Sequence, residues 1–531
     1  MQTTRKGGKA GTQTAGQIPG MAAARRPEPA PAGLRVLVVS PEIVPLAKTG
    51  GLADVAGSLP LALKDLGCDV RVAMPLYRCV RAPRRRLFDV QVPMGPKFHE
   101  CVQNSMPAPR DPAGGPPREA TSTAGICAAE LRSGIPAYLV DNPALFDRDS
   151  LYGYGDDAAR FGFFCRALLE SFGPLGWEPE LVHCNDWQSA MVPTYLKLIY
   201  KPDGKYSGTG TLFTIHNVEY QGNFDPGFLE VLGLGRELYN MEAIEFYGQL
   251  SLMKAGILFS DMVNTVSESY SQEIRTPSFG GKMDGVLRAN GQKLRGIVNG
   301  LDYEVWDPER DMALEQRFGP ATLASRSRNK AALQNDLGLD PDPGAFLLGF
   351  VGRLTIQKGI DILLPAVPEL LGSGCQLAAL GTGDQHYMDR MAETAGADPE
   401  RLAVMLKFDD RMARRIYGGC DAFLMPSQYE PCGLGQLIGL RYGAVPIVRR
   451  VGGLKDTVRE ARSGGDGTGF IFDDYVPEAL VDAVAAARQA YSNADLWKEI
   501  VLRGMTQDFS WKASAGKYLQ LYHELRGRPQ P

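Results

Sequence analysis

The feature that most constrains the fold is a unit of strand, polar loop and helix that recurs along the chain. LRVLVVS at 34–40 is an unbroken apolar run, and a helical pattern over about 52–66 and a second strand at 69–75 follow it. Strands covered on both faces have such continuous apolar sequences. Strand, loop, helix and strand form the parallel βαβ unit. The sequence therefore predicts an α/β protein with parallel sheets between layers of helices.

The same unit recurs in both halves of the chain. Further strands are predicted at 137–140, 180–186, 211–217, 261–267, 346–354, 376–384, 422–427 and 445–453, with helices at 156–172 and 509–525. Most of these strands lead into a loop with polar residues, and ligands of open α/β sheets bind at the carboxyl ends of strands. We therefore predict two Rossmann-like, doubly wound domains whose loops face a common cleft.

A chain of 531 residues has room for two large α/β domains. The predicted boundaries are a disordered tail at 1–33, an N-terminal domain at 34–296, a C-terminal domain at 297–510 and a C-terminal helix at 511–531. The tail is basic, with Glu28 as its only acid, which also fits a transit peptide. The Pro- and Gly-rich stretch at 106–119 predicts a long mobile loop.

Composition excludes several classes of protein. The net charge is −4 and the pI is about 5.9, which disfavours a nucleic-acid-binding groove. The nine cysteines contain no C-x-x-C pair, which argues against a disulfide framework or a zinc ribbon. No set of His, Cys and acidic residues has metal-ligand spacing. No apolar stretch reaches the ~20 residues that span a bilayer, so no membrane partner is expected.

A Gly-Gly-Leu sequence occurs before a predicted helix in each half, in TGGLADVAG at Thr49 and in VGGLKDTVR at Val451. Adjacent glycines at a helix N-terminus let a phosphate approach the backbone. Lys48 precedes the first pair, Gly50 and Gly51. A purely structural turn is the alternative, because the spacing of a Walker A loop is absent.

Charged residues follow two strands of the second half. Arg353 and Lys358 lie in GRLTIQKG, where they could clamp a diphosphate or be ordinary solvated charges. Glu430 lies between a strand and a helix, where its carboxylate could accept from sugar hydroxyls. The N–H groups that open that helix belong to Cys432, Gly433 and Leu434. The Cys432 thiol is expected to pack rather than to react.

Two strands of the first half also end in polar residues. His216 and Asn217 follow the strand at 211–215, and Asp186 and Trp187 end the strand at 180–186. A histidine there could contact a substrate or satisfy a buried polar position. The indole could stack on a sugar or pack in the core.

Seven motifs occur in order along the chain: KTGGLADV at Lys48, HCNDWQSAMVP at His183, FTIHNVEYQGNF at Phe213, NTVSESY at Asn264, GIVNGLDYEVWDP at Gly296, GRLTIQKG at Gly352 and EPCGL at Glu430. Together they resemble the family of bacterial glycogen synthases and plant starch synthases. The resemblance extends from Leu34 to the C-terminal helix.

The resemblance implies the two-domain architecture called GT-B, with the donor in the cleft and a C-terminal helix that crosses back to the first domain. It implies retaining transfer of glucose from ADP-glucose to the non-reducing end of an α-1,4-glucan such as glycogen, amylose or a malto-oligosaccharide. It implies no metal and no cofactor. The expected location is the cytoplasm, with the plastid stroma as the alternative.

The resemblance also implies residue roles. His216 would lie near the 6-hydroxyl of the transferred glucose, Arg353 and Lys358 at the diphosphate, and Glu430 at the glucose ring; these four are the predicted catalytic residues. The predicted substrate-binding residues are Lys48, Gly51, Asp54, Asp186, Asn217, Asn299, Phe408, Cys432, Gly433 and Leu434. Among these, Phe408 would stack on the base.

One position departs from the family pattern. Gly435 follows EPCGL where the family usually has Thr, so a Gly435→Thr change is predicted to raise activity or tighten donor binding. Three other readings are a binding protein without turnover, a related transferase that makes sucrose or a short glucoside, and a nicotinamide oxidoreductase. The last lacks a G-x-G-x-x-G loop after the first strand.

Overall fold

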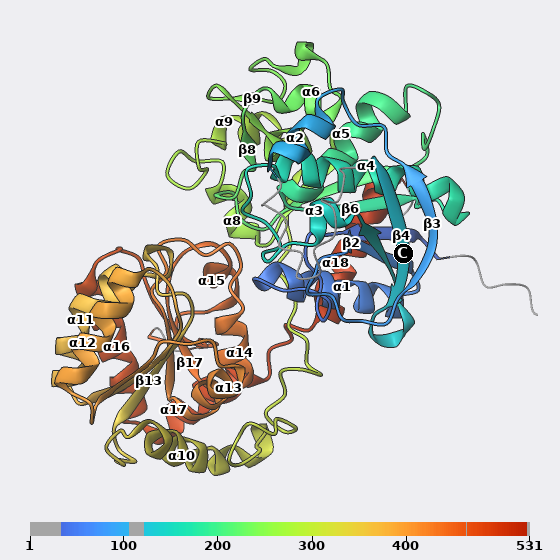
Figure 1. The fold of residues 1–531 in the computed structure, drawn as a ribbon. Helices are drawn as coiled ribbons and strands as arrows, with labels where there is room; N and C mark the ends of the chain where they lie inside the picture. Colours follow the sequence, from blue (N-terminus) through green and yellow to red (C-terminus); the bar gives the residue numbers. More distant parts are fainter. Residues whose placement is uncertain (1–32, 106–121, 463–464, 528–531) are drawn as a thin grey trace, which may run out of the picture.

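The computed structural model describes residues 33–105, 122–462 and 465–527, which form two α/β domains (Figure 1). The predicted two-domain α/β architecture is confirmed. The predicted tail, up to residue 32, and the predicted loop at 106–119 lie outside the described residues.

The N-terminal domain is built on a mixed sheet, in which nine strands are described. Their spatial order is β12 (Leu294–Gly296), β11 (Met262–Thr265), β7 (Gly210–Ile215), β6 (Leu181–Asn185), β1 (Arg35–Val39), β2 (Asp69–Pro75), β5 (Pro136–Asp141), β4 (Thr123–Glu130) and β3 (Arg85–Gln91). From β12 to β5 all neighbours are parallel. β4 and β3 add an antiparallel edge that the sequence did not predict.

The C-terminal sheet is parallel throughout the described residues. Its order is β15 (Leu402–Met405), β14 (Cys375–Leu380), β13 (Phe346–Val351), β16 (Ala422–Met425), β17 (Val445–Arg449) and β18 (Phe470–Phe472). Counted along the chain this is the 3-2-1-4-5-6 order of the Rossmann fold, which places a ligand crevice beside the first and fourth strands.

Helices cover both sheets. Those before the crossing into the second domain are α1 (Gly51–Asp65), α2 (Phe98–Ser105), α3 (Pro143–Phe146), α4 (Asp157–Leu175), α5 (Met191–Tyr195), α6 (Phe228–Leu232), α7 (Leu252–Phe259), α8 (Glu268–Glu273) and α9 (Asp284–Ala289). Those after it are α10 (Ser327–Leu337), α11 (Ile360–Gly372), α12 (Gln385–Ala397), α13 (Asp410–Gly419), α14 (Gly435–Arg441), α15 (Gly452–Thr457), α16 (Pro477–Tyr491), α17 (Ala494–Met505) and α18 (Trp511–Leu525).

A small antiparallel sheet projects from the N-terminal domain. It consists of β8 (Asn223–Phe224), β10 (Gln249–Ser251) and β9 (Glu245–Phe246), in that order. Strands of two or three residues are too short for alternation of apolar and polar side chains to reveal them. The sequence therefore gave no sign of this sheet.

The chain crosses between the domains twice. The apolar core of the first domain extends to Ile297, and that of the second begins at Leu301. The return crossing lies alongside, because the N–H of Leu301 donates to Phe509 O at 2.7 Å. Helix α18 then packs under the first domain, where Tyr518 and Tyr522 are fully buried (Figure 1).

Polar contacts fix α18 to the first sheet. The Tyr522 hydroxyl lies 2.8 Å from Nδ1 of His183 on β6, and Asn264 Nδ2 on β11 donates to the Tyr518 hydroxyl at 3.2 Å. Because the helix begins directly after the return crossing, these contacts tie the C-terminal domain to the first sheet at a hinge.

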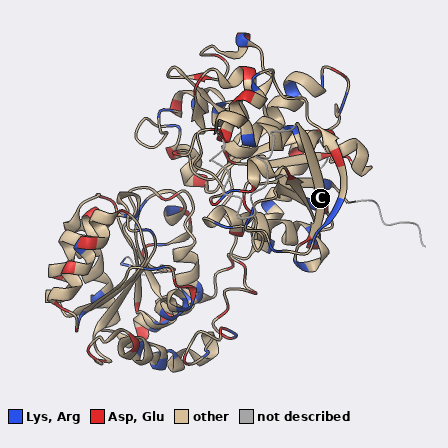
Figure 2. Cartoon of the chain, in the orientation of Figure 1, with Lys and Arg blue, Asp and Glu red and all other residues tan. Residues whose placement is uncertain are grey.

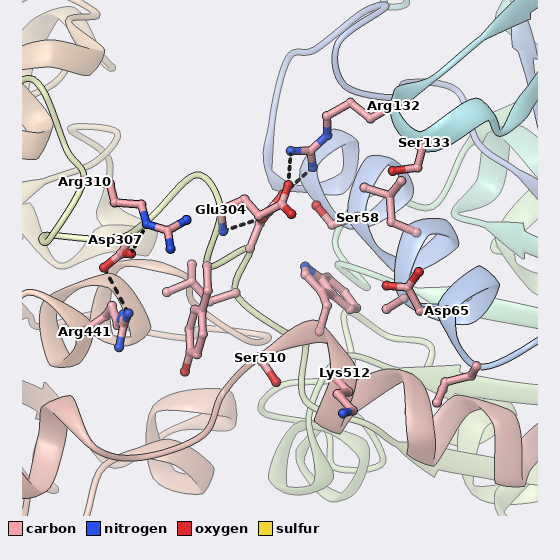
Figure 3. A pocket seen from close by; sticks show the side chains of 17 residues that line it. Ser58, Asp65, Arg132, Ser133, Glu304, Asp307, Arg310, Arg441, Ser510 and Lys512 are labelled. Carbon is pink, nitrogen blue, oxygen red and sulfur yellow. Dashed lines mark hydrogen bonds and ion pairs between the residues drawn. The ribbon is translucent and has the colours of Figure 1, made fainter.

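A cavity of about 550 Å³ lies at this hinge, between α1, the outgoing crossing and the start of α18 (Figure 3). Arg132 of the first domain pairs there with Asp302 and, at 3.4 Å, with Glu304 of the crossing. Asp307 pairs with Arg441 at 3.1 Å. None of the predicted site residues lines this cavity, so it is separate from the site described below.

Charges of both signs are interspersed over both domains in the view of Figure 2. No helix among the described residues is long and apolar enough to cross a bilayer.

Candidate active site

The first Gly-Gly loop faces the second domain across the cleft. Gly51 begins α1, and an ideal Cβ on it would lie 3.8 Å from Leu434 Cδ1 and within 4 Å of no other atom outside its chain neighbours and its own helix. An ideal Cβ on Gly50 would meet only Glu42 Oε1, at 4.0 Å. The backbone of this loop is therefore open to a ligand lying between the domains.

A buried carboxylate that the sequence analysis missed shapes this loop. Glu42 accepts from the Thr49 N–H, from the Thr49 hydroxyl at 2.8 Å and from the Gly50 N–H at 3.3 Å. Burial raises its pKa, and these hydrogen bonds oppose the rise. Glu42 lies in an irregular loop before the motif, where no periodicity marks an acid as buried.

Lys48 is held by the first turn of α1. Its Nζ lies 2.8 Å from Asp54 Oδ1, and both side chains are partly exposed. Burial raises the pKa of Asp54, and the hydrogen bond from Lys48 opposes it. Lys48 and Asp54 thus form an ion pair beside the Gly50-Gly51 loop.

The second Gly-Gly pair is part of the domain packing. A Cβ on Gly452 would lie 2.0 Å from Glu430 O, and one on Gly453 would lie 2.0 Å from Cys432 O. The Gly452 N–H donates to the Glu273 carboxylate of α8, in the other domain, at 2.9 and 3.0 Å. Like Gly50 and Gly51, these glycines lie between a strand and a helix. Here, however, they allow close backbone packing and leave no open loop for a phosphate.

The ends of β6 and β7 meet in one polar cluster. The His216 N–H donates to Asp186 Oδ1 at 2.7 Å, and His216 Nε2 lies 2.9 Å from Asn185 Oδ1. Asp186 has a φ of 54°, which is unusual for a residue other than glycine. Such outliers concentrate at functional sites, where the surrounding structure holds them in place.

Asn185 determines which nitrogen of His216 carries the proton. Its Nδ2 donates to Val39 O at 3.0 Å, so its Oδ1 must face the imidazole and accept from Nε2–H. Burial lowers the pKa of His216 to about 3, so the ring is neutral and Nδ1 keeps a lone pair. Burial raises the pKa of Asp186 to about 7, against the backbone hydrogen bonds from His216 and Asn217.

Arg353 follows β13 and reaches across the cleft. Its Nη1 donates to the Tyr220 hydroxyl of the first domain at 3.2 Å, and its Nη2 donates to Gln357 Oε1 at 2.7 Å. Beside it, burial raises the pKa of Tyr429 to about 12, and the Asn217 side chain of the first domain opposes the rise. The predicted residues of the two domains therefore approach one another around a single space.

Lys358 and Glu430 form an ion pair at the carboxyl ends of β13 and β16. Lys358 Nζ lies 2.6 Å from Glu430 Oε2, to which Ser427 Oγ also donates at 3.1 Å. Glu430 is buried, whereas the Lys358 side chain keeps 21% of its surface exposed. The next residue, Gly359, has a φ of 78° and packs against Pro426 O, so the turn that aims Lys358 requires glycine.

The Cys432 thiol is enclosed by the protein, which fits the packing role expected for the side chain. It is buried, and burial raises the pKa of its thiol to about 12. The backbone of Asn299, in the outgoing crossing, opposes this rise in the pKa. Asn299 Oδ1 is buried and has no hydrogen-bond partner in the described structure.

Phe408 lies apart from this cluster. It follows β15, and its ring is 88% exposed. The carboxyl ends of β15 and β13 share one edge of the parallel sheet, so the ring is on the same side as Arg353. The structure brings no described side chain against it.

Comparison with known proteins identifies the family. The family described as starch synthase catalytic domain matches residues 35–289, and glycosyl transferases group 1 matches residues 336–499. A glycogen synthase of Moorella thermoacetica is 45% identical over 495 residues, covering 92% of this chain and 96% of that protein. One of Syntrophotalea carbinolica is 44% identical and covers 92% and 99%. The chain belongs to the glycogen synthase family.

Solved structures agree with this assignment. The catalytic domain of starch synthase IV from Arabidopsis thaliana, bound to ADP and acarbose, matches with a TM-score of 0.82 and 30% identity, over 93% of this chain and all of that one. A sucrose-phosphate synthase from Thermosynechococcus elongatus has a TM-score of 0.56 at 18% identity, which shows a shared fold alone. The chain is therefore a glucosyltransferase of the glycogen synthase family with the GT-B fold.

Within this family site, sequence reasoning selected the strand-end residues and missed their supports. The sequence did not predict Glu42, Asn185 and Tyr220 as site residues, although each orients a residue that it did predict. Asn185 could have been found, because it immediately precedes Asp186 at a strand end. No sequence pattern marks Tyr220, because its partner Arg353 belongs to the second domain.

Proposed function

We propose that this protein transfers glucose from ADP-glucose to the non-reducing end of an α-1,4-glucan, with retention of the anomeric configuration. The observation that carries the proposal is the meeting of Arg353 and the Lys358–Glu430 pair with His216 and the open Gly50-Gly51 loop across one cleft. Arg353, Lys358 and Glu430 lie on the C-terminal side of this space, and His216 and the Gly50-Gly51 loop lie on the N-terminal side.

Arg353 and Lys358 would act on the leaving diphosphate. Transfer requires the bond from the anomeric carbon to the diphosphate to break, so negative charge grows on the phosphate oxygens. Both cations are fixed before the reaction, Arg353 by Gln357 and Lys358 by Glu430. Preorganised charges of this kind stabilise a transition state without further reorganisation.

His216 would bind a hydroxyl of the transferred glucose. Its Nε2–H is occupied by Asn185, so Nδ1 is the nitrogen that can accept. Asp186 acts as a positioning residue, because it fixes the backbone of His216 and Asn217. Glu430 would accept from ring hydroxyls beside the anomeric carbon.

The acceptor would attack on the same face as the leaving group. Glu430 is already bound to Lys358 and Ser427, so retention would arise from front-face attack by the acceptor hydroxyl and not from a covalent intermediate. Closure of the two domains would exclude water, which otherwise hydrolyses the donor.

ADP is proposed as the donor nucleotide on the strength of family membership and of the starch synthase IV complex with ADP. We also propose that no metal or cofactor is required, because the two cations supply the charge that the diphosphate needs. Addition of EDTA should then leave the rate unchanged. The bacterial origin of the compared glycogen synthases favours the cytoplasm over a plastid stroma.

The deciding experiment incubates the purified protein with ADP-glucose or UDP-glucose, with and without glycogen, and follows release of the nucleoside diphosphate. Release that requires both ADP-glucose and glycogen supports the proposal, and NMR of the product establishes the new linkage as α. Preference for UDP-glucose would overturn the donor assignment. No release from either would support a binding protein without turnover.

A further inference from the structure

A tyrosine occupies the tip of a tight hairpin in a backbone conformation that suits it poorly. β9 and β10 are joined by Tyr247 and Gly248, whose φ values are 49° and 79°. Two-residue turns with both φ values positive strongly prefer Asn-Gly. A bulky residue with positive φ is an outlier.

Packing does not explain this tyrosine. Its side chain is 71% exposed, so the ring contributes little to the apolar core. The turn is nevertheless held firmly: the Gly248 N–H donates to Glu245 Oε1 at 2.7 Å, and the Tyr239 hydroxyl donates to Gly248 O at 2.9 Å. The surroundings therefore fix the ring in an exposed position, which points to a role in binding.

A buried lysine holds the same hairpin in place through hydrogen bonds to its backbone. Lys254 of α7 is only 4% exposed, and its Nζ donates to Met241 O and to Glu245 O at 2.6 Å each. Burial lowers the pKa of this lysine. A cation committed to two carbonyls of one loop makes the hairpin a rigid platform.

A second strained residue faces the exposed ring. Lys282 has a φ of 66°, and its Nζ lies 5.4 Å from the centroid of the Tyr247 ring. Its neighbour Gly281 accepts from Gln221 Nε2 at 2.6 Å. Gln221 in turn follows Tyr220, whose hydroxyl accepts from Arg353 in the active site.

These contacts connect the hairpin to the cleft. In Figure 1, β8 and β9 lie on the same side of the N-terminal domain as α8, which packs against α15 of the other domain. Exposed tyrosines lie along this series of contacts: Tyr220 binds Arg353, Tyr247 lies beside Lys282, and Tyr239 binds the same hairpin through Gly248 O. A ligand that leaves the cleft on this side would meet tyrosine rings in succession.

The chemistry of the surface fits a neutral polyhydroxylated chain. Tyrosine offers an apolar ring face together with a polar end, which matches the C–H faces and hydroxyls of a pyranose. An anionic polymer is disfavoured, because Glu237, Glu242 and Glu245 lie in the same segment and Lys282 is the cation at the ring.

We propose that Tyr247, Lys282 and Tyr239 form a binding surface for the α-glucan acceptor outside the cleft, which holds sugar units remote from the reacting end. The proposal rests on the proposed function for the identity of its ligand. It gives a long glucan an advantage over a short one, because only the long chain reaches from the donor to Tyr247.

The test compares the full chain with Tyr247→Ala, Tyr247→Phe and, as a control in the other domain, Met312→Ala, whose side chain is 78% exposed in the wild type. Migration in native gels that contain glycogen, without any donor, gives the affinity. Loss of the ring should weaken glycogen binding roughly fivefold, the size of one aromatic contact. Met312→Ala should bind as the wild type does, and Tyr247→Phe, which keeps the ring face, should lose less affinity than Tyr247→Ala.

Kinetics provide the second readout. In Tyr247→Ala, KM for glycogen should rise by a similar factor, while kcat and the KM for maltotriose stay unchanged. Unchanged glycogen affinity in Tyr247→Ala overturns the proposal, as does an equal loss in Tyr247→Phe. If the wild type binds glycogen through Tyr247 but transfers no glucose from any donor, the surface stands and the proposed transferase activity fails.

Discussion

The ion pair between Lys358 and Glu430 makes the rate of transfer depend strongly on one residue, Lys358. Removing the ammonium takes away a charge from the leaving diphosphate and leaves a buried carboxylate without its cation. Lys358→Ala should therefore lower kcat by roughly 10²–10³-fold, as for loss of one preorganised transition-state donor.

The measurement for Lys358 is steady-state release of ADP, with Lys498→Ala on α17 as the matched control. Lys498 is exposed and outside the site, so its variant should keep wild-type kcat. A loss below tenfold in Lys358→Ala would remove this lysine from the diphosphate clamp.

At Gly435 the structure reverses the expectation from sequence. A Cβ there would lie 2.9 Å from Phe423 Cε1 and 3.2 Å from Met425 Sδ, and Phe423 is fully buried. Threonine therefore overpacks the site, at a cost of about 1–3 kcal/mol. Gly435→Thr should lower the midpoint of thermal unfolding by roughly 2–10 °C and should not raise activity.

Differential scanning calorimetry of Gly435→Thr, Phe423→Leu and the double variant tests this explanation. The double variant should recover part of the loss, because the smaller side chain makes room for the new Cβ. Strictly additive losses would show that Phe423 is not what excludes threonine.

At the scale of elements, α18 depends on a histidine that stays neutral. His183 on β6 touches the Tyr522 hydroxyl, and burial lowers its pKa to about 3. In the unfolded chain this histidine takes up a proton as the pH falls through about 6.5, whereas in the folded chain it stays neutral. Stability is thus lost as pH falls from about 6.5 towards 3. His216 acts in the same direction, and Asp186, whose pKa is raised to about 7, acts in the opposite one.

The midpoint of thermal unfolding should therefore drop between pH 7 and pH 5, and it should drop less steeply in His183→Asn. The exposed His386 on α12 supplies the control, because His386→Asn should follow the wild-type curve. Parallel curves for the wild type and His183→Asn would exclude His183 as a source of acid sensitivity.

Some strands can be predicted from the sequence much better than others. The buried parallel strands β1, β7 and β13 were found within a few residues, because a strand covered on both faces must be apolar throughout. The edge strand β3, RRLFDVQ, and the two- and three-residue strands β8 to β10 carry no such pattern. Their pairing partners, and not their own composition, make them strands.

At the scale of the whole molecule, the pair of Arg132 with Asp302 braces the hinge (Figure 3). It joins the first domain to the outgoing crossing at a partly exposed position, so its effect on stability should stay below about 1 kcal/mol. In the proposed mechanism the two domains close before transfer, so loss of this ion pair should change the rate. Arg132→Ala should lower kcat/KM for the donor about two- to fivefold with little change in unfolding temperature.

A double-mutant cycle with Asp302→Ala checks the assignment of this effect. The second substitution should cost little once Arg132 is gone, and Arg85→Ala at the sheet edge should leave kcat/KM unchanged. Independent, additive effects of Arg132→Ala and Asp302→Ala would show that the pair does not act on closure.

The sequence by itself determined the two α/β domains, the parallel strands at their centres and the strand-end positions of His216, Arg353 and Glu430. These follow from local rules, since apolar runs must be buried and parallel strands present their carboxyl ends at one edge. Only the tertiary structure decided which groups meet: Tyr220 with Arg353, Glu42 with the Gly50 loop, and Tyr247 with Lys282. Those contacts join segments far apart in the chain, and their geometry is set by packing that no local pattern encodes.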